Sequence, residues 1–238
     1  MLLLAIDTSA RATAALLRVH EGDSTAAGVQ VLDRFTADRV NAHAEVLSPA
    51  IAGMLAEASV NGREIDHIVV GVGPGPFTGL RVGIATANAL GFAWSVPVGG
   101  VVSLDAIAWQ AVRQGEANGR FVTAIDARRR ELYWGVYDAE ARLVDGPHVG
   151  AAGAVAGYPV YGAGAGIYPE ALAEAGATPV AGWDDVVPDA AALGAAAART
   201  LAAGGELLAT TPLYLRESDA KVPAAMVQGP STQPRGAA

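Results

Sequence analysis

The chain has 238 residues, enough for one large domain or two small ones, and it contains no cysteine. The lack of cysteine excludes disulfides, thiolate metal sites and cysteine nucleophiles, and it is typical of a reducing, cytoplasmic compartment. A formal net charge of −8 makes the chain alone a poor binder of polyanions, and its only basic run is Arg128 to Arg130.

Neither a secretion signal nor a membrane span is expected. The start of the chain, Met1 to Ile6, lacks the basic residues of a signal peptide and meets Asp7 at once. The uncharged stretch Val82 to Val102 contains polar residues and a proline. We interpret it as a helix followed by a strand in a buried core, so no membrane contact is expected.

The first half of the chain is expected to follow the order βββαβαβ. Short apolar runs predict strands, and apolar residues at i, i+3 and i+4 predict helices. The expected strands are Leu2–Asp7, Thr13–Val19, Val29–Thr36, His67–Val72 and Val96–Val102, and the expected helices are Ala42–Ser59 and Gly79–Trp94. Pro49 falls inside the first helix and is expected to kink it.

A turn rich in glycine and proline, residues 71–83, joins the fourth strand to the second helix. Gly73, Gly75 and Gly79 permit backbone conformations and close approaches that other residues resist. Thr78 is expected to cap the helix, with its hydroxyl accepting a first-turn N–H. The turn is therefore expected to be rigid.

Arg81 follows in the first turn of that helix, where the helix dipole disfavours a cation by about 0.3–1 kcal/mol. That position suggests a specific anionic partner. The turn matches neither the P-loop nor the dinucleotide fingerprint, so a bound phosphate is the weaker interpretation. The favoured one is a structural turn in which Arg81 pairs with a local carboxylate.

The second half of the chain repeats the opening pattern. Each half has a strand that ends in aspartate, Asp7 or Asp126, followed by a short turn with arginine and a second strand. The further elements expected here are helices at Ser103–Gln114, Pro169–Ala175 and Asp189–Ala203, strands at Glu131–Tyr137 and Arg142–Val149, and a strand with a tight turn at Val160–Gly164. Such a repeat implies two similar subdomains that face each other.

These subdomains are expected at residues 1–103 and 104–219. The segment Pro212–Arg216 is expected to pack back on the first subdomain. Residues 220–238 are rich in proline, glycine, glutamine and serine, and we expect a disordered, dispensable tail.

A duplicated βββαβα unit with an aspartate at each first hairpin indicates an α/β fold of the actin, Hsp70 and sugar-kinase type (ASKHA). In that fold the two hairpin turns hold ATP phosphates and the aspartates hold Mg²⁺. Neither turn here contains glycine, so close approach of a phosphate is restricted. The nucleotide site is therefore expected to be degenerate, with Asp7 and Asp126 as turn-forming residues.

No metal site, cofactor or catalytic residue is expected. The four histidines, His20, His43, His67 and His148, form no short ligand spacing. The hydroxyls near the predicted turns have no evident base beside them, so nucleophilic catalysis has no support.

Five segments together resemble the TsaB (YeaZ) family, in the right order and over about residues 2–216. They are Leu4–Ser9, His43–Pro49, Gly73–Gly83, Asp126–Trp134 and Pro212–Arg216. One departure is Pro76, where the family usually has serine. It removes a hydroxyl and an N–H and so weakens an anion-binding role for the turn.

The resemblance implies a cytoplasmic, non-catalytic subunit that binds a TsaD-like paralogue. That paralogue transfers threonylcarbamoyl to form N6-threonylcarbamoyladenosine (t6A) beside the tRNA anticodon. The resemblance further implies that a TsaE-like ATPase docks on the pair, that tRNA is met only through the complex, and that the isolated chain can form a homodimer.

The partner interface is expected on the two helices of the first half. The second helix is apolar around most of its circumference and should be buried on two sides. The residues expected to meet the partner are Val46, Ala50, Met54, Gly83, Ala87 and Leu90.

Two other function classes stay open. One is an ATP-binding enzyme of the sugar-kinase type, which tight binding of Mg-ATP would favour. The other is an M22-type peptidase homologue, for which zinc content is the first check.

Overall fold

The computed structural model describes residues 1–20, 28–38, 43–155 and 157–216. The expected tail, residues 220–238, and the expected helix start at Ala42 lie outside the described residues. Within the described part, no helix is both long and apolar enough to cross a membrane.

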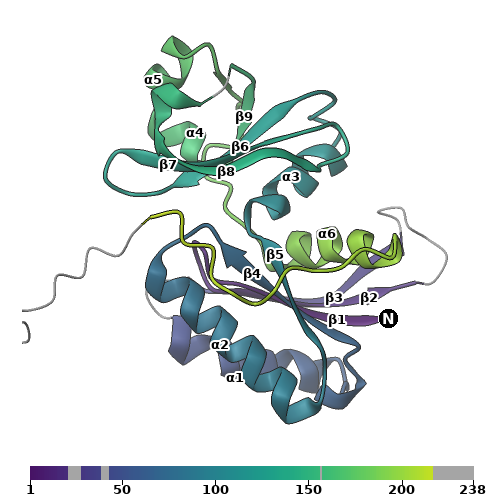
Figure 1. Cartoon of the computed structure of the whole chain (residues 1–238). Helices are drawn as coiled ribbons and strands as arrows, with labels where there is room; N and C mark the ends of the chain where they lie inside the picture. Colours follow the sequence, from purple (N-terminus) through teal and green to yellow (C-terminus); the bar gives the residue numbers. More distant parts are fainter. Residues whose placement is uncertain (21–27, 39–42, 156, 217–238) are drawn as a thin grey trace, which may run out of the picture.

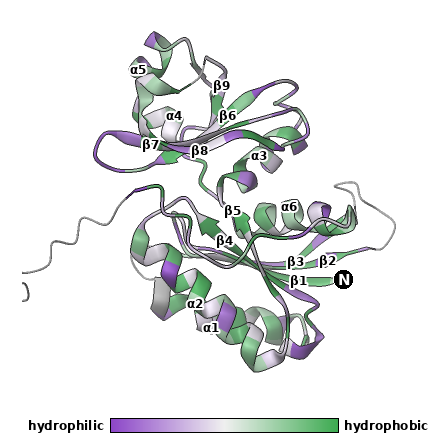
Figure 2. Cartoon of the chain, viewed as in Figure 1, coloured by the Kyte–Doolittle hydropathy of each residue, from purple (hydrophilic) through white to green (hydrophobic). Residues whose placement is uncertain are grey.

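The first half forms a five-stranded mixed sheet of order β3-β2-β1-β4-β5. Its strands are β1 (Leu2–Asp7), β2 (Thr13–Val19), β3 (Val29–Thr36), β4 (His67–Gly73) and β5 (Val98–Val102). β1 pairs antiparallel with β2 and parallel with β4. Figure 1 shows helices on both faces of this sheet, which explains why its central strands are almost continuously apolar (Figure 2).

Two helices, α1 (His43–Glu57) and α2 (Phe77–Trp94), cover one face of this sheet. A short 3₁₀ helix, η2 (Gly62–Glu64), precedes β4. Leu4 and Ile6 of β1 point into the core beneath α1 and α2, whereas Leu3 and Ala5 point to the opposite core. This alternation follows from the two-residue period of a strand, and all four side chains are fully buried.

The second half forms a sheet of order β10-β9-β6-β7-β8, which repeats the strand pairing of the first. Its strands are β6 (Phe121–Asp126), β7 (Glu131–Tyr137), β8 (Leu143–Ala151), β9 (Pro159–Tyr161) and β10 (Thr178–Pro179). The helical elements packed with it are α3 (Leu104–Arg113), η3 (Ala152–Ala154), α4 (Ala163–Ile167) and α5 (Pro169–Glu174). Ala163 and Gly164, expected in the tight turn, instead begin helix α4 after Gly162, whose φ is +104°.

The last helix, α6 (Ala190–Ala202), leaves the second half and packs on β1, β2 and β4 of the first sheet. The expected division between residues 103 and 104 places α6 in the second subdomain. In the structure, α6 instead packs on the sheet of the first. The helix approaches the sheet closely because it is built from alanine and glycine. A Cβ on Gly194 would overlap the side chains of Leu17 and Ala5.

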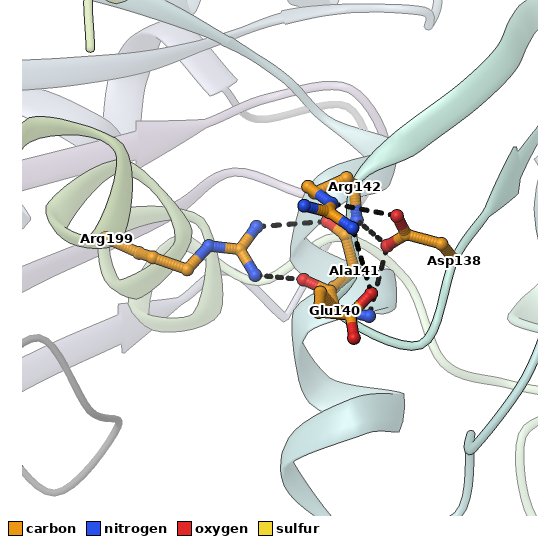
Figure 3. A network of polar contacts seen from close by, with 5 residues as sticks. All are labelled: Asp138, Glu140, Ala141, Arg142 and Arg199. Atoms are coloured by element: carbon orange, nitrogen blue, oxygen red, sulfur yellow. Dashed lines mark hydrogen bonds and ion pairs between the residues drawn. The ribbon is translucent and has the colours of Figure 1, made fainter. Parts of the chain in front are cut away.

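Arg199 of α6 connects the two subdomains (Figure 3). Its guanidinium donates hydrogen bonds to the backbone oxygens of Glu140 and Ala141, which lie in the turn between β7 and β8. The distance to the Ala141 oxygen is 3.0 Å. The guanidinium also lies 5.0 Å from the ring centre of Trp109 on α3. One side chain therefore ties the helix of the first sheet to the hairpin of the second.

We predict that Arg199→Ala lowers the free energy of unfolding by roughly 1–3 kcal/mol, the usual effect of losing hydrogen bonds made by a charged group. Urea unfolding followed by circular dichroism measures this loss. The matched control is Arg142→Ala in the same network, because Arg142 is 67% exposed and its ion pairs with described residues, Asp138 and Glu140, lie within its own hairpin. Equal losses in the two variants would show that Arg199 does not connect the subdomains.

Candidate functional site

The turn after β1 is organised by the buried carboxylate of Asp7. Its Oδ1 accepts hydrogen bonds from the backbone N–H of Ser9 at 2.8 Å and from the Ser9 hydroxyl at 2.6 Å. Its Oδ2 accepts from the hydroxyl of Ser103 at 2.6 Å. The Ser103 hydroxyl in turn accepts from the Gly73 N–H at 3.2 Å. Asp7 therefore joins β1 to the glycine-rich turn and to the start of α3.

Burial raises the pKa of Asp7 to about 6, although the hydrogen bonds from Ser103 and Ser9 act in the opposite direction. The side chain is fully buried and faces protein hydroxyls. Both carboxylate oxygens accept hydrogen bonds from within the protein, and this geometry is that of a turn-forming residue.

The glycine-rich turn packs directly on this network. A Cβ on Gly71 would overlap the Asp7 carboxylate, and a Cβ on Gly75 would lie 2.9 Å from the backbone of Ser9. Gly73 has a φ of +109°, which side chains rarely tolerate. The backbone oxygen of Gly79 accepts a hydrogen bond from the Thr8 hydroxyl at 2.8 Å. The turn is thus built to meet the Asp7 hairpin.

The expected capping role of Thr78 is wrong. Helix α2 begins at Phe77, one residue before Thr78, and the N-cap residue is Pro76 with no side-chain capping bond. Thr78 is consequently the second helical residue, where its hydroxyl is not placed to accept from the first turn. The fixed φ of proline, here −60°, suits the residue that starts the helix.

Arg81 pairs with aromatic rings, so the expected carboxylate partner is also wrong among the described residues. Its Nε donates to the hydroxyl of Tyr214 at 2.9 Å, and its guanidinium lies 3.7 Å from the ring centre of Phe77. The Phe77 and Tyr214 rings stack at 4.4 Å. These contacts fasten the C-terminal segment to the start of α2. No sequence pattern could indicate them, because 133 positions separate Arg81 from Tyr214.

The second aspartate turn has a different geometry. Asp126 accepts a hydrogen bond from the Arg128 N–H at 2.7 Å and forms an ion pair with the Arg128 guanidinium at 3.0 Å. Arg128, Arg129 and Arg130 have φ values of 61°, 55° and 65°, so all three are left-handed. The turn takes this conformation without glycine, although left-handed backbone is costly for other residues.

The glycine-rich turn and the turn after Asp126 lie on either side of a cleft between the subdomains. A cavity of about 330 Å³ in this cleft is lined by residues 75–77 of the glycine-rich turn, by residues 126–129 and Tyr133 of the second sheet, and by residues 214–216. Arg216 donates to the Ala127 oxygen at 2.9 Å and forms an ion pair with Glu131. Among the described residues, no group of three or more histidine, aspartate or glutamate side chains is placed to hold a metal.

Known proteins with similar sequence and structure agree on the family. A family model described as TsaD, tRNA N6-adenosine threonylcarbamoyltransferase, matches residues 31–180. A Mycobacterium tuberculosis protein described as uncharacterized is 38% identical over 230 residues, which are 92% of this chain and 93% of that protein. The structure titled YeaZ from Pseudomonas aeruginosa is 32% identical, with a TM-score of 0.73, over 90% of this chain and 99% of that one. The chain belongs to the TsaB (YeaZ) family.

A protein of Haemophilus influenzae named tRNA threonylcarbamoyladenosine biosynthesis protein TsaB is 35% identical over 132 residues, 56% of this chain and 52% of that protein. The expected actin, Hsp70 and sugar-kinase fold is confirmed by the YeaZ match and by the two sheets with the same strand pairing.

Three of the six residues expected at a TsaB partner interface lie inside the chain's own core. Met54 and Ala87 belong to the apolar cluster between the α1–α2 layer and the first sheet, and Gly83 lies against Thr8. The small residues of α2 therefore serve its packing on the sheet, and an arginine at Ala87 would disrupt the fold. The other three, Val46, Ala50 and Leu90, are half-buried.

The exposed residues of these helices are a different set. Its small and aromatic members, which we call the α1–α2 outer face, are Ala52, Gly53, Ala56, Ala85, Ala89, Phe92 and Ala93, and Glu57 and Asn88 are exposed beside them. Phe92 is 91% exposed, and a Cβ on Gly53 would meet nothing within 4 Å. Sequence reasoning missed this face because α2 is uncharged on both sides; the only signal was one large aromatic residue among small ones.

We predict that the buried Asp7 makes folding less favourable as the pH rises. Because the pKa of Asp7 is raised from 3.8 to about 6, the folded state binds more protons than the unfolded state between these values. The unfolding free energy of the wild type, relative to Asp7→Asn, should therefore fall across this window by up to about 3 kcal/mol and stay level above it. Urea unfolding at a series of pH values measures the difference.

Asp138→Asn is the control of opposite sign. Although burial acts against it, the hydrogen bonds from Arg142 lower the pKa of Asp138. Relative to this variant, the wild type should gain stability as the pH rises through the acidic range. Parallel pH profiles for Asp7→Asn and Asp138→Asn would contradict the assignment.

Proposed function

We propose that this chain is the non-catalytic subunit that binds and supports a TsaD-like threonylcarbamoyltransferase in forming t6A in tRNA. Its family supports this role, since relatives of 28–35% identity are named as t6A biosynthesis proteins. The observation that carries the proposal is the exposed Phe92 on α2, whose other exposed residues after Arg81 are uncharged: Ala85, Asn88, Ala89 and Ala93.

The aspartate turns support a subunit without chemistry of its own. In the ASKHA fold these turns hold the nucleotide and its Mg²⁺, but the Asp7 oxygens here accept three hydrogen bonds from Ser9 and Ser103. The Asp126 carboxylate is occupied by Arg128. A carboxylate that is already satisfied within the protein is a poor metal ligand.

The α1–α2 outer face supports a helical partner. Its small residues permit close approach of other helices, and Phe92 offers a large aromatic side chain of the kind that dominates interface energies. After Arg81, α2 contains no charged residue. A partner that packs on the rest of this helix would therefore not have to remove any of its charges from water.

A TsaD-like protein is a suitable partner because the TsaD family model also matches this chain. Two proteins of related fold carry equivalent helix pairs, which can pack about a pseudo-two-fold axis into one four-helix layer. A homodimer of the isolated chain would use the same face. Docking of a TsaE-like ATPase, contact with tRNA through the complex and a cytoplasmic location complete the proposal.

We predict that Phe92→Glu and Gly53→Arg abolish stoichiometric co-purification with a TsaD-like partner while the monomer stays folded. Each change puts a charge at an exposed position, and burying it at a helical interface should cost at least about 2 kcal/mol. Co-expression, affinity capture and gel filtration measure the complex, and circular dichroism checks the fold.

The matched control is Val144→Glu, an exposed apolar residue on β8 with 47% of its surface accessible. It should leave the complex intact. If both helix variants still co-purify stoichiometrically, the interface lies elsewhere; if Val144→Glu also dissociates the complex, the effect is not specific to this face.

We predict that the isolated chain neither hydrolyses ATP nor forms t6A, and that adding a TsaD-like partner with its substrates restores t6A formation. Phosphate release and mass spectrometry of digested tRNA are the measurements. Metal-dependent turnover by the pure chain that Asp7→Asn abolishes would instead favour the sugar-kinase-like alternative.

A further inference from the structure

We propose that Asn118 and Gly119 form a site of spontaneous covalent modification, at which Asn118 loses its side-chain amide to water and becomes aspartate or isoaspartate. The two residues lie in the segment that connects α3 to β6, residues 114–120. The proposed function gives this segment no role, so the inference goes beyond it and does not depend on the identity of a partner.

The chain contains the tripeptide Asn-Gly-Arg twice, at residues 61–63 and 118–120. An asparagine reacts most readily when glycine follows it, because the glycine nitrogen is the attacking group and glycine has no side chain to restrict its approach. Since the two tripeptides are identical, their intrinsic reactivity is nearly equal. A difference between the two sites in the folded protein must therefore come from the structure around them.

The reaction begins when the backbone nitrogen of Gly119 attacks the amide carbon, Cγ, of Asn118. A C–N bond forms, the proton of the Gly119 N–H passes to solvent, and the side-chain nitrogen takes a proton from solvent and leaves as ammonia. The product is a cyclic imide. Water then opens this ring at one of its two carbonyl carbons, which gives aspartate or isoaspartate. In total, one water is consumed, one ammonia is released and the chain gains one carboxylate.

The structure leaves Asn118 and Gly119 free to react. Both residues are exposed, and a Cβ on Gly119 would meet no atom within 4 Å. Among the described residues, none forms a hydrogen bond with the Asn118 side chain or with the Gly119 N–H. The side chain and the backbone can therefore rotate into the arrangement that closes the ring without breaking a hydrogen bond.

The same tripeptide at Asn61 is held in a capping box at the start of η2. The Asn61 side-chain oxygen accepts from the Arg63 N–H at 3.0 Å, and the Asn61 N–H donates to the Glu64 carboxylate at 2.7 Å. Gly62 is buried against Trp94, so that a Cβ there would overlap the indole ring. Ring closure requires the Asn61 side chain and its ψ angle, here 143°, to rotate, and that rotation breaks the capping box.

The modified protein should stay folded, because both sides of the site are anchored. On one side, the backbone oxygen of Glu116 accepts from the Tyr161 hydroxyl at 2.8 Å, and its carboxylate accepts from the Trp183 Nε1–H at 2.7 Å. On the other side, Phe121 begins β6 and is 1% exposed. The exposed residues between these anchors take up the extra main-chain methylene of isoaspartate. The product is a folded chain whose formal charge is one unit more negative.

The test is a time course in which the purified full chain is incubated at physiological temperature and digested with trypsin. Trypsin cuts after arginine, so the two sites are released in separate peptides, residues 40–63 and 114–120. Mass spectrometry detects the exchange of NH for O, and electron-transfer fragmentation distinguishes isoaspartate from aspartate. Asn118 should react at least about tenfold faster than Asn61 in the folded chain, because Asn61 must first leave its capping box. In urea the two sites should react at similar rates.

The test variant is Gly119→Ala, which has room for its methyl group and should fold as the wild type does. Alanine restricts the backbone conformations from which the ring closes. The variant should therefore slow the reaction of Asn118 by at least about tenfold, since the attacking nitrogen reaches the amide carbon less often. Asn61 in the same sample is the matched control, and its rate should not change.

Equal rates at the two sites of the folded chain would overturn the proposal. So would a folded chain that stays unmodified at residue 118 while the unfolded chain reacts there. Undiminished reaction in Gly119→Ala would also overturn it, because water would then be attacking the amide directly. Phe92→Glu should be modified at the wild-type rate, and Asn118→Asp should still co-purify with a TsaD-like partner, so this test can fail without affecting the proposed function.

Discussion

One buried carboxylate determines how the parts of the first subdomain meet. Transferring a charged group from water into a protein interior costs several kcal/mol unless hydrogen bonds replace the lost hydration. Asp7 recovers that interaction from Ser9 and Ser103, and it thereby fixes the end of β1 against the start of α3. Gly71 has no side chain because one would occupy the carboxylate's place. The glycine-rich turn, and with it the direction of α2, follows from this arrangement.

Much of the fold could be predicted because the central strands are buried on both faces and the strands are bounded by turn residues. The limits of β1, β2, β3 and β7 agree with the sequence interpretation residue for residue. The position of α6 could not be predicted, since an alanine-rich helix has no marked apolar side to indicate its sheet. Helix α2 also has no marked difference in polarity between its two sides, so the sequence does not indicate which side is exposed. Small residues that pack on the sheet were therefore interpreted as a partner interface.

The candidate site was harder to predict because its contacts join distant parts of the chain. The interpretation of Asp7 and Asp126 rested on local turn composition, and the hydrogen bonds of both residues support it. Arg81 was assigned an anion from the helix dipole, but the rings of Phe77 and Tyr214 stabilise its charge. Such a contact between the start of a helix and a C-terminal segment leaves no periodicity or spacing in the sequence.

The return of α6 to the first sheet has a consequence for folding during synthesis. Leu3, Ala5 and Leu17 are covered on one side by residues of α6, nearly two hundred positions later in the chain. Until that helix leaves the ribosome, this apolar face lacks the larger part of its cover and has only Ala106 and Trp109 of α3 packed with it, whereas the strands of the second sheet have already been made. The part of the protein that is made first is therefore the part that finishes folding last, and during that interval it is the surface most prone to aggregation or chaperone binding.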